Sequence, residues 1–354
     1  MTVAAASADH PRNSEAAVYP RRDGSLLLIY QEYLASPRGG GDDAPNRLVA
    51  VVSNDGGRSW TDKRIVAEPA PDQVNVYSPS LLPSQGGDLL LFHYAYQAIG
   101  AGQAVDSTGY LARSSDEGEH FSDRRVVWKH RPFGAASSAV TRLPSGRLLF
   151  PVEHHVGELW TAEASIQARC VISDDEGETW QEGAAVRLPL RGCMEPHIEA
   201  LTDGSVLMVM RTQLGSVFSC RSRDEGMTWS LPQATELRAP ESCPELARHP
   251  RSGELWLLWN DGEYDPGFGS HFGKRSPLSL AVSRDEGRTW QRRSVIESDP
   301  DRAFTNPGVC FLQDGSAIVN YWTCRYRPDW RMANDSIDLR VALLDGSGSP
   351  LPPR

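Results

Sequence analysis

Two places in this chain bring together residue types that could bind an anion and transfer protons. Glu195 and Arg211 lie on either side of the turn at Gly204, and the segment 31–47 (QEYLASPRGGGDDAPNR) carries two adjacent aspartates, Asp42 and Asp43. A planar guanidinium binds a carboxylate through two parallel hydrogen bonds. A carboxyl group can transfer a proton or stabilise a positive charge. These residue types predict a site that binds an anionic ligand and moves protons.

The elements that must position these residues are six copies of one pattern: an apolar strand, a glycine turn and a second apolar strand. The copies span residues 16–30, 79–94, 138–153, 196–211, 244–260 and 307–322. Each pattern is typical of a β-hairpin. The residue before each first strand and the residue seven after each turn glycine are therefore expected to meet at one end of the hairpins. The first set is Glu15, Ser78, Ser137, Glu195, Cys243 and Asn306; the second is Gln31, Tyr94, Glu153, Arg211, Asn260 and Trp322.

A second repeat, S-x-D-x-G-x-x-(W/F), runs in register with the first. It occupies residues 53–60, 114–121, 173–180, 222–229 and 283–290, and residues 339–348 (LRVALLDGSG) hold a degenerate copy. The aspartate suits a turn because it accepts backbone hydrogen bonds, and the glycine tolerates positive φ. With strands before and after each octet, the chain predicts an all-β, six-bladed β-propeller of four-stranded antiparallel blades. Residues 1–354 form a single domain in this interpretation, with residues 1–12 as a candidate for disorder.

Composition excludes several classes of protein. The 354 residues include 36 Lys+Arg and 46 Asp+Glu, so the net charge of −10 argues against a nucleic-acid surface. No apolar run approaches the roughly 20 residues of a membrane helix, and no basic, apolar leader opens the chain. The six cysteines form no CxxC pair, so we expect reduced thiols, a cytoplasmic location, and neither metal nor cofactor. The oligomeric state stays open.

The five octets, placed between the third and fourth strands of six blades, resemble the Asp-box (BNR) repeats of the sialidase (neuraminidase) superfamily over nearly the whole chain. The resemblance implies an exo-acting glycoside hydrolase that releases a terminal acidic sugar, sialic acid or a related one, from glycans. It assigns Arg211 and Arg275 to a clamp on the substrate carboxylate and Glu195 to the catalytic neighbourhood. The general acid would come from the loop after the first hairpin, as Asp42 or Asp43, with Glu32 as the fallback.

Two positions depart from the sialidase pattern. Ser14 stands where the first clamp arginine of an Arg-Ile-Pro motif is expected, unless Arg12 or Arg21 reaches in. Phe304 stands where the nucleophilic tyrosine is expected, and phenylalanine has no oxygen. Tyr77 or Tyr94 could replace it. Otherwise water attacks directly with a carboxylate as base, which inverts the anomeric centre.

The hairpin spacing and the resemblance to sialidases together give the full set of predicted site residues. The catalytic candidates are Glu195, Asp42, Asp43 and Tyr77; the substrate-binding candidates are Arg211, Arg275, Glu15, Ser78, Tyr94, Glu153, His155, Asn260, Asn306 and Trp322. Long connections at the same end, which also carry His154 and His271, should enlarge the site. Two alternatives remain: a polysaccharide lyase on a uronic-acid glycan, with His155, Tyr94 or Tyr77 as base, or a non-catalytic glycan-binding propeller.

Overall fold

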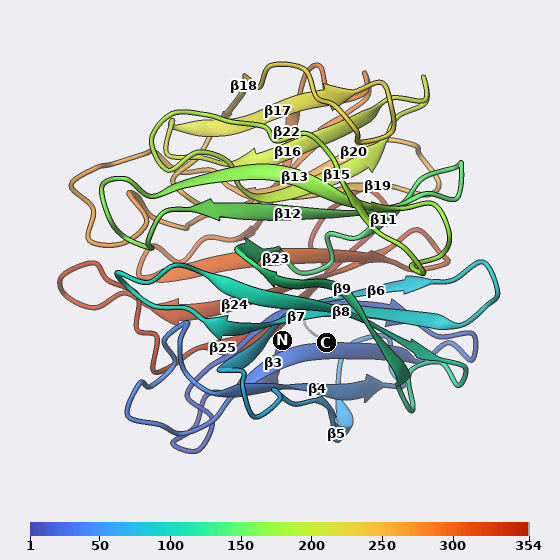
Figure 1. The fold of residues 1–354 in the computed structure, drawn as a ribbon, viewed down its shortest axis with the longest axis horizontal. Coiled ribbons are helices and arrows are strands. Elements are labelled where there is room, and N and C mark those ends of the chain that lie inside the picture. The colour runs from blue at the N-terminus through green and yellow to red at the C-terminus, as the bar shows by residue number, and fades with distance from the viewer. Residues whose placement is uncertain (353–354) are drawn as a thin grey trace.

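The chain folds as a six-bladed β-propeller, seen in the computed structural model, which describes residues 1–352 (Figure 1). Six separate antiparallel sheets follow one another along the chain, as predicted. Blade one contains β2 (Asn13–Pro20), β3 (Leu26–Tyr33), β4 (Asn46–Ser53) and β5 (Thr61–Ala67). Blade two contains β6 (Asn75–Pro83), β7 (Leu89–Ala98), β8 (Asp106–Ser114) and β9 (Ser122–Arg131). Blade three contains β10 (Phe133–Gly134), β11 (Thr141–Arg142), β12 (Leu148–Val156), β13 (Ser165–Ser173) and β14 (Gln181–Glu182).

The other three blades follow the same plan. Blade four contains β15 (Met194–Ala200), β16 (Val206–Arg211), β17 (Ser216–Ser222) and β18 (Gln233–Arg238). Blade five contains β19 (Glu245–Arg248), β20 (Leu255–Asn260), β21 (Leu278–Ser283) and β22 (Gln291–Glu297). Blade six contains β23 (Arg302–Phe311), β24 (Ala317–Arg325), β25 (Asp338–Leu344) and β1 (Thr2–Ala4). Within the described residues, no helix is long and apolar enough to cross a membrane.

The sixth blade is completed by the start of the chain, which corrects the expectation that residues 1–12 are disordered. Strand β1 pairs antiparallel with β25, with Thr2 opposite Arg340 and Ala4 opposite Leu339. The Ala6 amide donates to Asp338 Oδ1 at 2.9 Å. The segment is ordered because it supplies the outer strand that the degenerate sixth repeat lacks.

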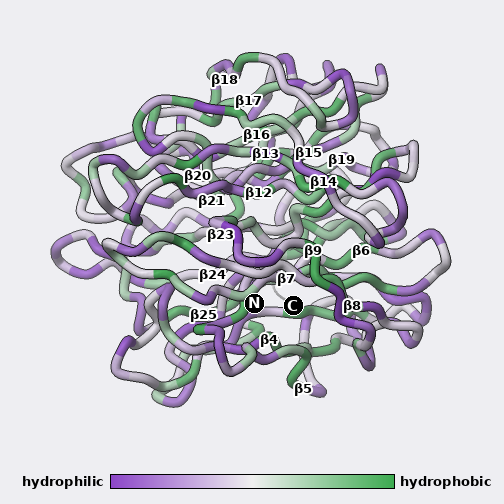
Figure 2. The backbone as a smooth tube through the Cα atoms, viewed as in Figure 1, coloured by the Kyte–Doolittle hydropathy of each residue, from purple (hydrophilic) through white to green (hydrophobic). Residues whose placement is uncertain are grey.

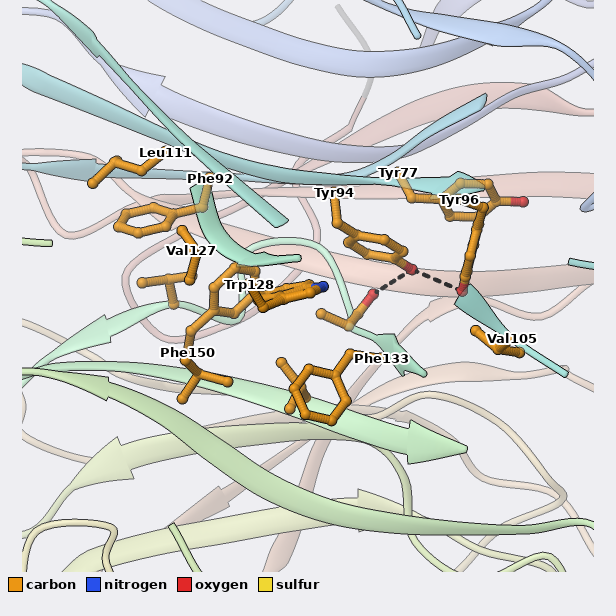
Figure 3. Packing of buried hydrophobic residues seen from close by; sticks show 14 of the residues in the cluster. Tyr77, Phe92, Tyr94, Tyr96, Val105, Leu111, Val127, Trp128, Phe133 and Phe150 are labelled. Atoms are coloured by element: carbon orange, nitrogen blue, oxygen red, sulfur yellow. Dashed lines mark hydrogen bonds between the residues drawn. The ribbon is translucent and has the colours of Figure 1, made fainter. Parts of the chain in front are cut away.

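Each blade places its apolar strands inside and its polar strand outside. All eight residues of β3 are buried, whereas most of β5 is exposed. Figure 2 shows hydrophobic stretches along many strands and hydrophilic stretches in many of the peripheral loops. Aromatic rings fill the space between blades two and three: Phe150 lies 5.6 Å from Phe92 and 5.1 Å from Trp128, measured between ring centroids (Figure 3). Blade packing of this kind fixes the relative positions of the strand ends.

The five octets are turns, as predicted. In the first, Ser53 Oγ donates to Asp55 Oδ1 at 2.8 Å, and the Gly57 amide donates to Ser53 Oγ at 2.8 Å. The Ser59 hydroxyl donates to Asp55 Oδ2 at 2.6 Å and the Ser59 amide donates to Asp55 Oδ1 at 2.9 Å. Together with the bond from Ser53, these two bonds lower the pKa of Asp55 to about 2. Gly57 has φ of +87°, which glycine adopts without strain. The octets lie at the end of each blade away from the segments that precede the first strands.

A bulge recurs near the start of the innermost strand in four blades. The strand register shifts between Ser14 and Ala16 in blade one, and at the matching places of blades two, four and six. The residues in the shifts adopt positive φ: Glu15, Ser78, Glu195 and Asn306. Non-glycine residues rarely take this conformation, which often marks functional positions. These are four of the six first-set residues that the hairpin pattern predicted to surround the site.

Candidate active site

A cavity of about 400 Å³ opens at the end of the ring where the first strands begin and the second strands finish. Residues from all six blades line it, so the ring closure is what assembles the cavity. It brings together these predicted residues: Glu15, Asp42, Asp43, Tyr77, Ser78, Tyr94, Glu153, His155, Glu195, Arg211, Arg275, Asn306 and Trp322. Arg12, Tyr96, Trp160, Arg191 and His271 line it as well.

Arg12, and not Arg21, supplies the arginine of blade one. Its Nη2 donates to both Glu15 carboxylate oxygens, at 3.1 and 3.2 Å, and its Nη1 donates to Asp42 Oδ1 at 2.7 Å. Arg12 Nε donates to Ser14 Oγ at 2.9 Å, so the longer side chain reaches past the serine. Arg21 is bound instead to Glu119, outside the cavity lining.

Glu15 is a buried carboxyl group on the cavity wall. Trp322 Nε1 donates to its Oε1 at 3.1 Å, beside the two bonds from Arg12. Burial raises the pKa of Glu15 even though Arg12 lowers it. A carboxyl group with a raised pKa stays protonated to higher pH, which is a property of general acids.

Glu195 and Arg211, which the hairpin spacing predicted to lie close together, form an ion pair. Arg211 Nη1 donates to Glu195 Oε2 at 2.8 Å, and Asn306 Nδ2 donates to Glu195 Oε1 at 3.3 Å. Arg211 Nη2 also lies 3.3 Å from Glu241 Oε1, the atom to which Arg191 donates at 2.9 Å. Two guanidinium groups therefore share one fully buried carboxylate.

Arg275 is a buried cation held by uncharged groups. Its Nη2 donates to the Glu241 carbonyl at 2.8 Å and its Nη1 donates to Thr305 Oγ1 at 2.7 Å. In the part of the chain that the structure describes, no carboxylate pairs with it. Burial and the neighbouring charge of Arg211 lower the pKa of Arg275 to about 10. A buried cation without a counter-ion is energetically costly, so this position favours an anionic ligand.

Phenol groups cover the blade-two side of the cavity. Tyr33 Oη donates to Tyr77 Oη at 2.6 Å, and Tyr77 Oη donates to the Asp42 carbonyl at 3.0 Å. Burial raises the pKa of Tyr77 well above its usual value, so the neutral phenol is favoured. Figure 3 shows the rings of Tyr77, Tyr94 and Tyr96 next to one another, with Tyr94 Oη 3.3 Å from Tyr96 Oη.

His155 and Glu153 form a second polar pair, on blade three. His155 Nε2 donates to Glu153 Oε1 at 3.1 Å, and the Glu195 amide donates to Glu153 Oε2 at 3.2 Å. The neighbouring His154 lies on the other face of β12 and packs edge-on against Phe133 at 5.3 Å. Strand alternation explains why only one of the two histidines reaches the cavity.

The expected tyrosine position is occupied by a core residue. Phe304 is fully buried and packs edge-on against Tyr321, with ring centroids 6.0 Å apart. Asn306, two residues further along β23, takes the place next to Glu195. The site thus has no phenol in contact with Glu195 among the described hydrogen bonds. Tyr77 Oη lies beside Asp42 instead, 3.5 Å from its Oδ1.

Several residues expected at the cavity are structural instead. Asn260 Nδ2 donates to the Phe304 carbonyl at 2.8 Å, and Gln31 Nε2 donates to the Val76 carbonyl at 3.0 Å, so both connect one blade to the next. Cys243 and Ser137 are buried outside the lining. Glu32 forms ion pairs with Arg47 and Lys63 away from the cavity, which removes it as the fallback acid.

The repeats did not identify Arg191, and Trp160 falls only within one of the long connections that were expected to enlarge the site. Both lie on connections between strands, where no repeat fixes a register. The Arg191 guanidinium lies over the Trp160 ring, 4.1 Å from its centroid, and Trp160 is 57% exposed. Across residues 1–352 no cluster of three or more His, Cys, Asp or Glu could hold a metal ion. The lining can bind an anion, donate to hydroxyl groups and transfer protons between carboxyl groups.

Comparison with known proteins places this architecture in a family. Residues 24–319 match the BNR repeat-like domain. The chain is 29% identical over 312 residues to a sialidase of Micromonospora viridifaciens; the match covers 78% of this chain and 44% of that protein, so the chain spans less than half of that relative. The same fold occurs in a Dyadobacter fermentans protein of unknown function (TM-score 0.71, 17% identity, 96% of each chain).

A second solved structure with this fold is the NanB sialidase of Streptococcus pneumoniae. It has a TM-score of 0.70 and 12% identity, and the match covers 96% of this chain and 68% of that one. At this level of identity, the likeness concerns the fold. The five octets, the six blades and the domain match together show that the chain belongs to the BNR repeat-like family, as a sialidase-like propeller.

Proposed function

We propose that this protein is an exo-acting glycoside hydrolase that releases a terminal acidic sugar, sialic acid or a close relative, from a glycan. The observation that carries the proposal is the convergence of Arg12, Arg211 and Arg275 on one cavity beside Glu195. Arginine binds carboxylates through a planar fork, and Arg275 is buried without a carboxylate partner among the described residues. The similarity to a sialidase supports the same reaction class.

The residues divide into binding and chemistry in this proposal. Arg211 and Arg275 hold the substrate carboxylate, and Arg12 completes the clamp while orienting Asp42. Glu195 accepts one proton from water, whose oxygen bonds to the anomeric carbon as the glycosidic C–O bond breaks. Asp42, as the general acid, gives a proton to the leaving oxygen. Each Glu195 oxygen has one donor, from Arg211 or Asn306, which leaves lone pairs free for the water.

Direct attack by water is favoured over a tyrosyl intermediate. Phe304 has no oxygen, and Tyr77 is a neutral phenol already bonded to Tyr33 and Asp42. A single displacement inverts the anomeric centre. Proton NMR during the first minutes of hydrolysis distinguishes the two routes. We expect the inverted anomer first, and the retained anomer would contradict water attack.

The activity is tested with 4-methylumbelliferyl α-sialoside and a panel of 4-methylumbelliferyl uronides. We expect the folded protein to release fluorophore, and Arg211→Lys to lower kcat/KM by ~10–100-fold because the bidentate contact is lost. Arg58→Lys, on an exposed octet, is the matched control and should retain activity. No release from any glycoside would contradict the hydrolase and leave the glycan-binding alternative. An unsaturated, ultraviolet-absorbing product from uronic polysaccharides would identify a lyase instead.

A further inference from the structure

The imidazole of His271 lies within the arginine cluster of the cavity. Arg211 Nη2 is 3.1 Å from His271 Nδ1. A guanidinium nitrogen can only donate, so Nδ1 must be the acceptor of this bond. A neutral imidazole with a lone pair on Nδ1 carries its proton on Nε2. The contact therefore fixes the tautomer as well as the ring position.

The surroundings keep this imidazole neutral. Burial, and then the charges of Arg275, Arg211, Arg191 and Arg12, lower the pKa of His271 well below its usual value. The nearest acidic group is Glu241, whose Oε2 is 3.9 Å from Nδ1. Protonation would also place an N–H opposite the N–H of Arg211. The ring is thus a neutral hydrogen-bond donor at neutral pH.

The Nε2 edge of His271 faces the open cavity. The side chain is 23% exposed, and the residue belongs to the cavity lining. Among residues 1–352, the hydrogen bonds of this side chain are limited to the Arg211 contact, and Nε2 is not one of the buried polar atoms that lack a partner. An accessible N–H is therefore left for a ligand, next to two arginines.

A constrained turn holds the ring in this position. His271 and Phe272 have φ of +51° and +50°, and Gly273 has φ of +144°. A Cβ on Gly273 would lie 2.3 Å from the Glu263 carbonyl oxygen, so only glycine fits. The Glu241 amide donates to the His271 carbonyl at 3.1 Å, which joins the turn to the carboxylate shared by Arg191 and Arg211. Backbone conformations of this kind are found at ligand-binding positions.

We propose that His271 is a substrate-binding residue that donates its Nε2–H to the carboxylate of the acidic sugar, between Arg211 and Arg275. This inference rests on the proposed function and adds a fourth donor to the clamp. A neutral donor suits this place because a further cation would repel the arginines already there. Nδ1 positions Arg211 while Nε2 binds ligand, so one ring links the clamp to the substrate.

The two roles of the ring can be separated with two variants. His271→Asn keeps an acceptor near the Nδ1 position and loses the Nε2 donor, whereas His271→Gln keeps a donor near Nε2 and loses the acceptor. Asparagine tolerates positive φ better than glutamine. Backbone strain would therefore weaken His271→Gln, the variant that is expected to bind well, more than His271→Asn. Ser270→Ala, on the same loop with no side-chain hydrogen bond in the described structure, is the matched control.

Binding is measured by calorimetry with 2-deoxy-2,3-didehydro-N-acetylneuraminic acid and with its methyl ester. We expect His271→Asn to weaken binding of the acid by about tenfold or more, the value of one charge-assisted hydrogen bond, and to leave the ester almost unchanged. His271→Gln should bind the acid within about threefold of the wild type, a shift too small for a lost charge-assisted bond. Melting temperatures confirm that each variant is folded.

The outcomes separate the inference from the proposed function. If the wild-type protein binds neither acid nor ester and releases no sugar, the proposed function is wrong. If it binds the acid but His271→Asn binds equally well, His271 only positions Arg211 and the inference is overturned. An equal loss in both variants, or in the ester as well as the acid, also overturns it.

Discussion

At the scale of single residues, the cavity holds more than one carboxyl group able to protonate a leaving group. Asp42 is bonded to Arg12 and open to solvent, whereas burial raises the pKa of Glu15. We expect Asp42→Asn to lower turnover of alkyl glycosides by ~10²–10⁴-fold, the usual contribution of a general acid. Aryl glycosides with good leaving groups need little protonation and should react at nearly the wild-type rate. The two kcat/KM values are compared in one preparation.

Glu15→Gln is the control for this assignment. If it shows the dependence on leaving group and Asp42→Asn does not, the acid is Glu15. In that case the activity should also depend on pH in a defined way. Because the pKa of Glu15 is raised, its acid form persists to a higher pH, and activity should fall on the alkaline side at a higher pH than an exposed glutamic acid would give. A loss that is the same for both classes of substrate would contradict either assignment.

Eight of the twelve residues counted from the repeats line the cavity, including the four at the bulges, and counting failed where a long side chain reaches in from another position. Glu195, Arg211 and Glu153 follow from hairpin register. Arg12 does not, because its side chain extends past Ser14 from two residues earlier. Asn260 occupies an equivalent register position, but its side chain donates to the next blade. The register fixes where a residue lies in the hairpin and does not decide whether its side chain bonds to a neighbouring blade or to a ligand.

At the scale of elements, each octet is a turn held by hydrogen bonds to an aspartate carboxylate. The free energy of unfolding that this turn contributes should therefore depend on pH. Hydrogen bonds from Ser59 and Ser53 lower the pKa of Asp55 to about 2, from a usual value near 3.8. A group with a lowered folded-state pKa contributes stability that is present above its unfolded pKa and is lost as pH falls toward the folded one. The contribution should therefore disappear between about pH 4 and pH 2.

Asp55→Asn tests this dependence. We expect a lower melting temperature at pH 7 and a smaller fall in melting temperature between pH 4 and pH 2 than in the wild type, because the ionisable partner has been removed. Asp72→Asn, at an exposed aspartate for which no hydrogen bond is found within residues 1–352, should match the wild type at every pH. Parallel pH curves for Asp55→Asn and the wild type would contradict an ionic role for the octet aspartate.

At the scale of the whole molecule, the ring is closed by two segments far apart in the sequence. Strand β1 completes the sheet of β23–β25, and the Leu351 amide donates to the Leu343 carbonyl at 2.8 Å, so both ends of the described chain meet in one blade (Figure 1). The sequence predicted six units but left the sixth without an outer strand. A strand of three residues carries too little periodicity to be recognised, and its partner is more than 300 residues away.

Closure of this kind should make the short first strand important to the whole ring. Val3 packs against the core cluster beneath β25, whereas Thr2 is exposed. We expect Val3→Asp to destabilise the protein by ~1–3 kcal/mol, the cost of placing an unpaired polar group at a largely apolar contact. Thr2→Asp should leave the melting temperature nearly unchanged.

Hydrogen exchange then reports on whether the ring stays closed. The amides of residues 339–341 of β25 should lose protection from exchange in Val3→Asp only. If they remain protected while the protein is destabilised, the strand stabilises by local packing and not by closing the ring; unchanged stability would show that blade six holds without it. Because the cavity takes residues from blade one and blade six alike, an opened ring should also weaken binding of the acidic ligand at Arg12 and Asn306.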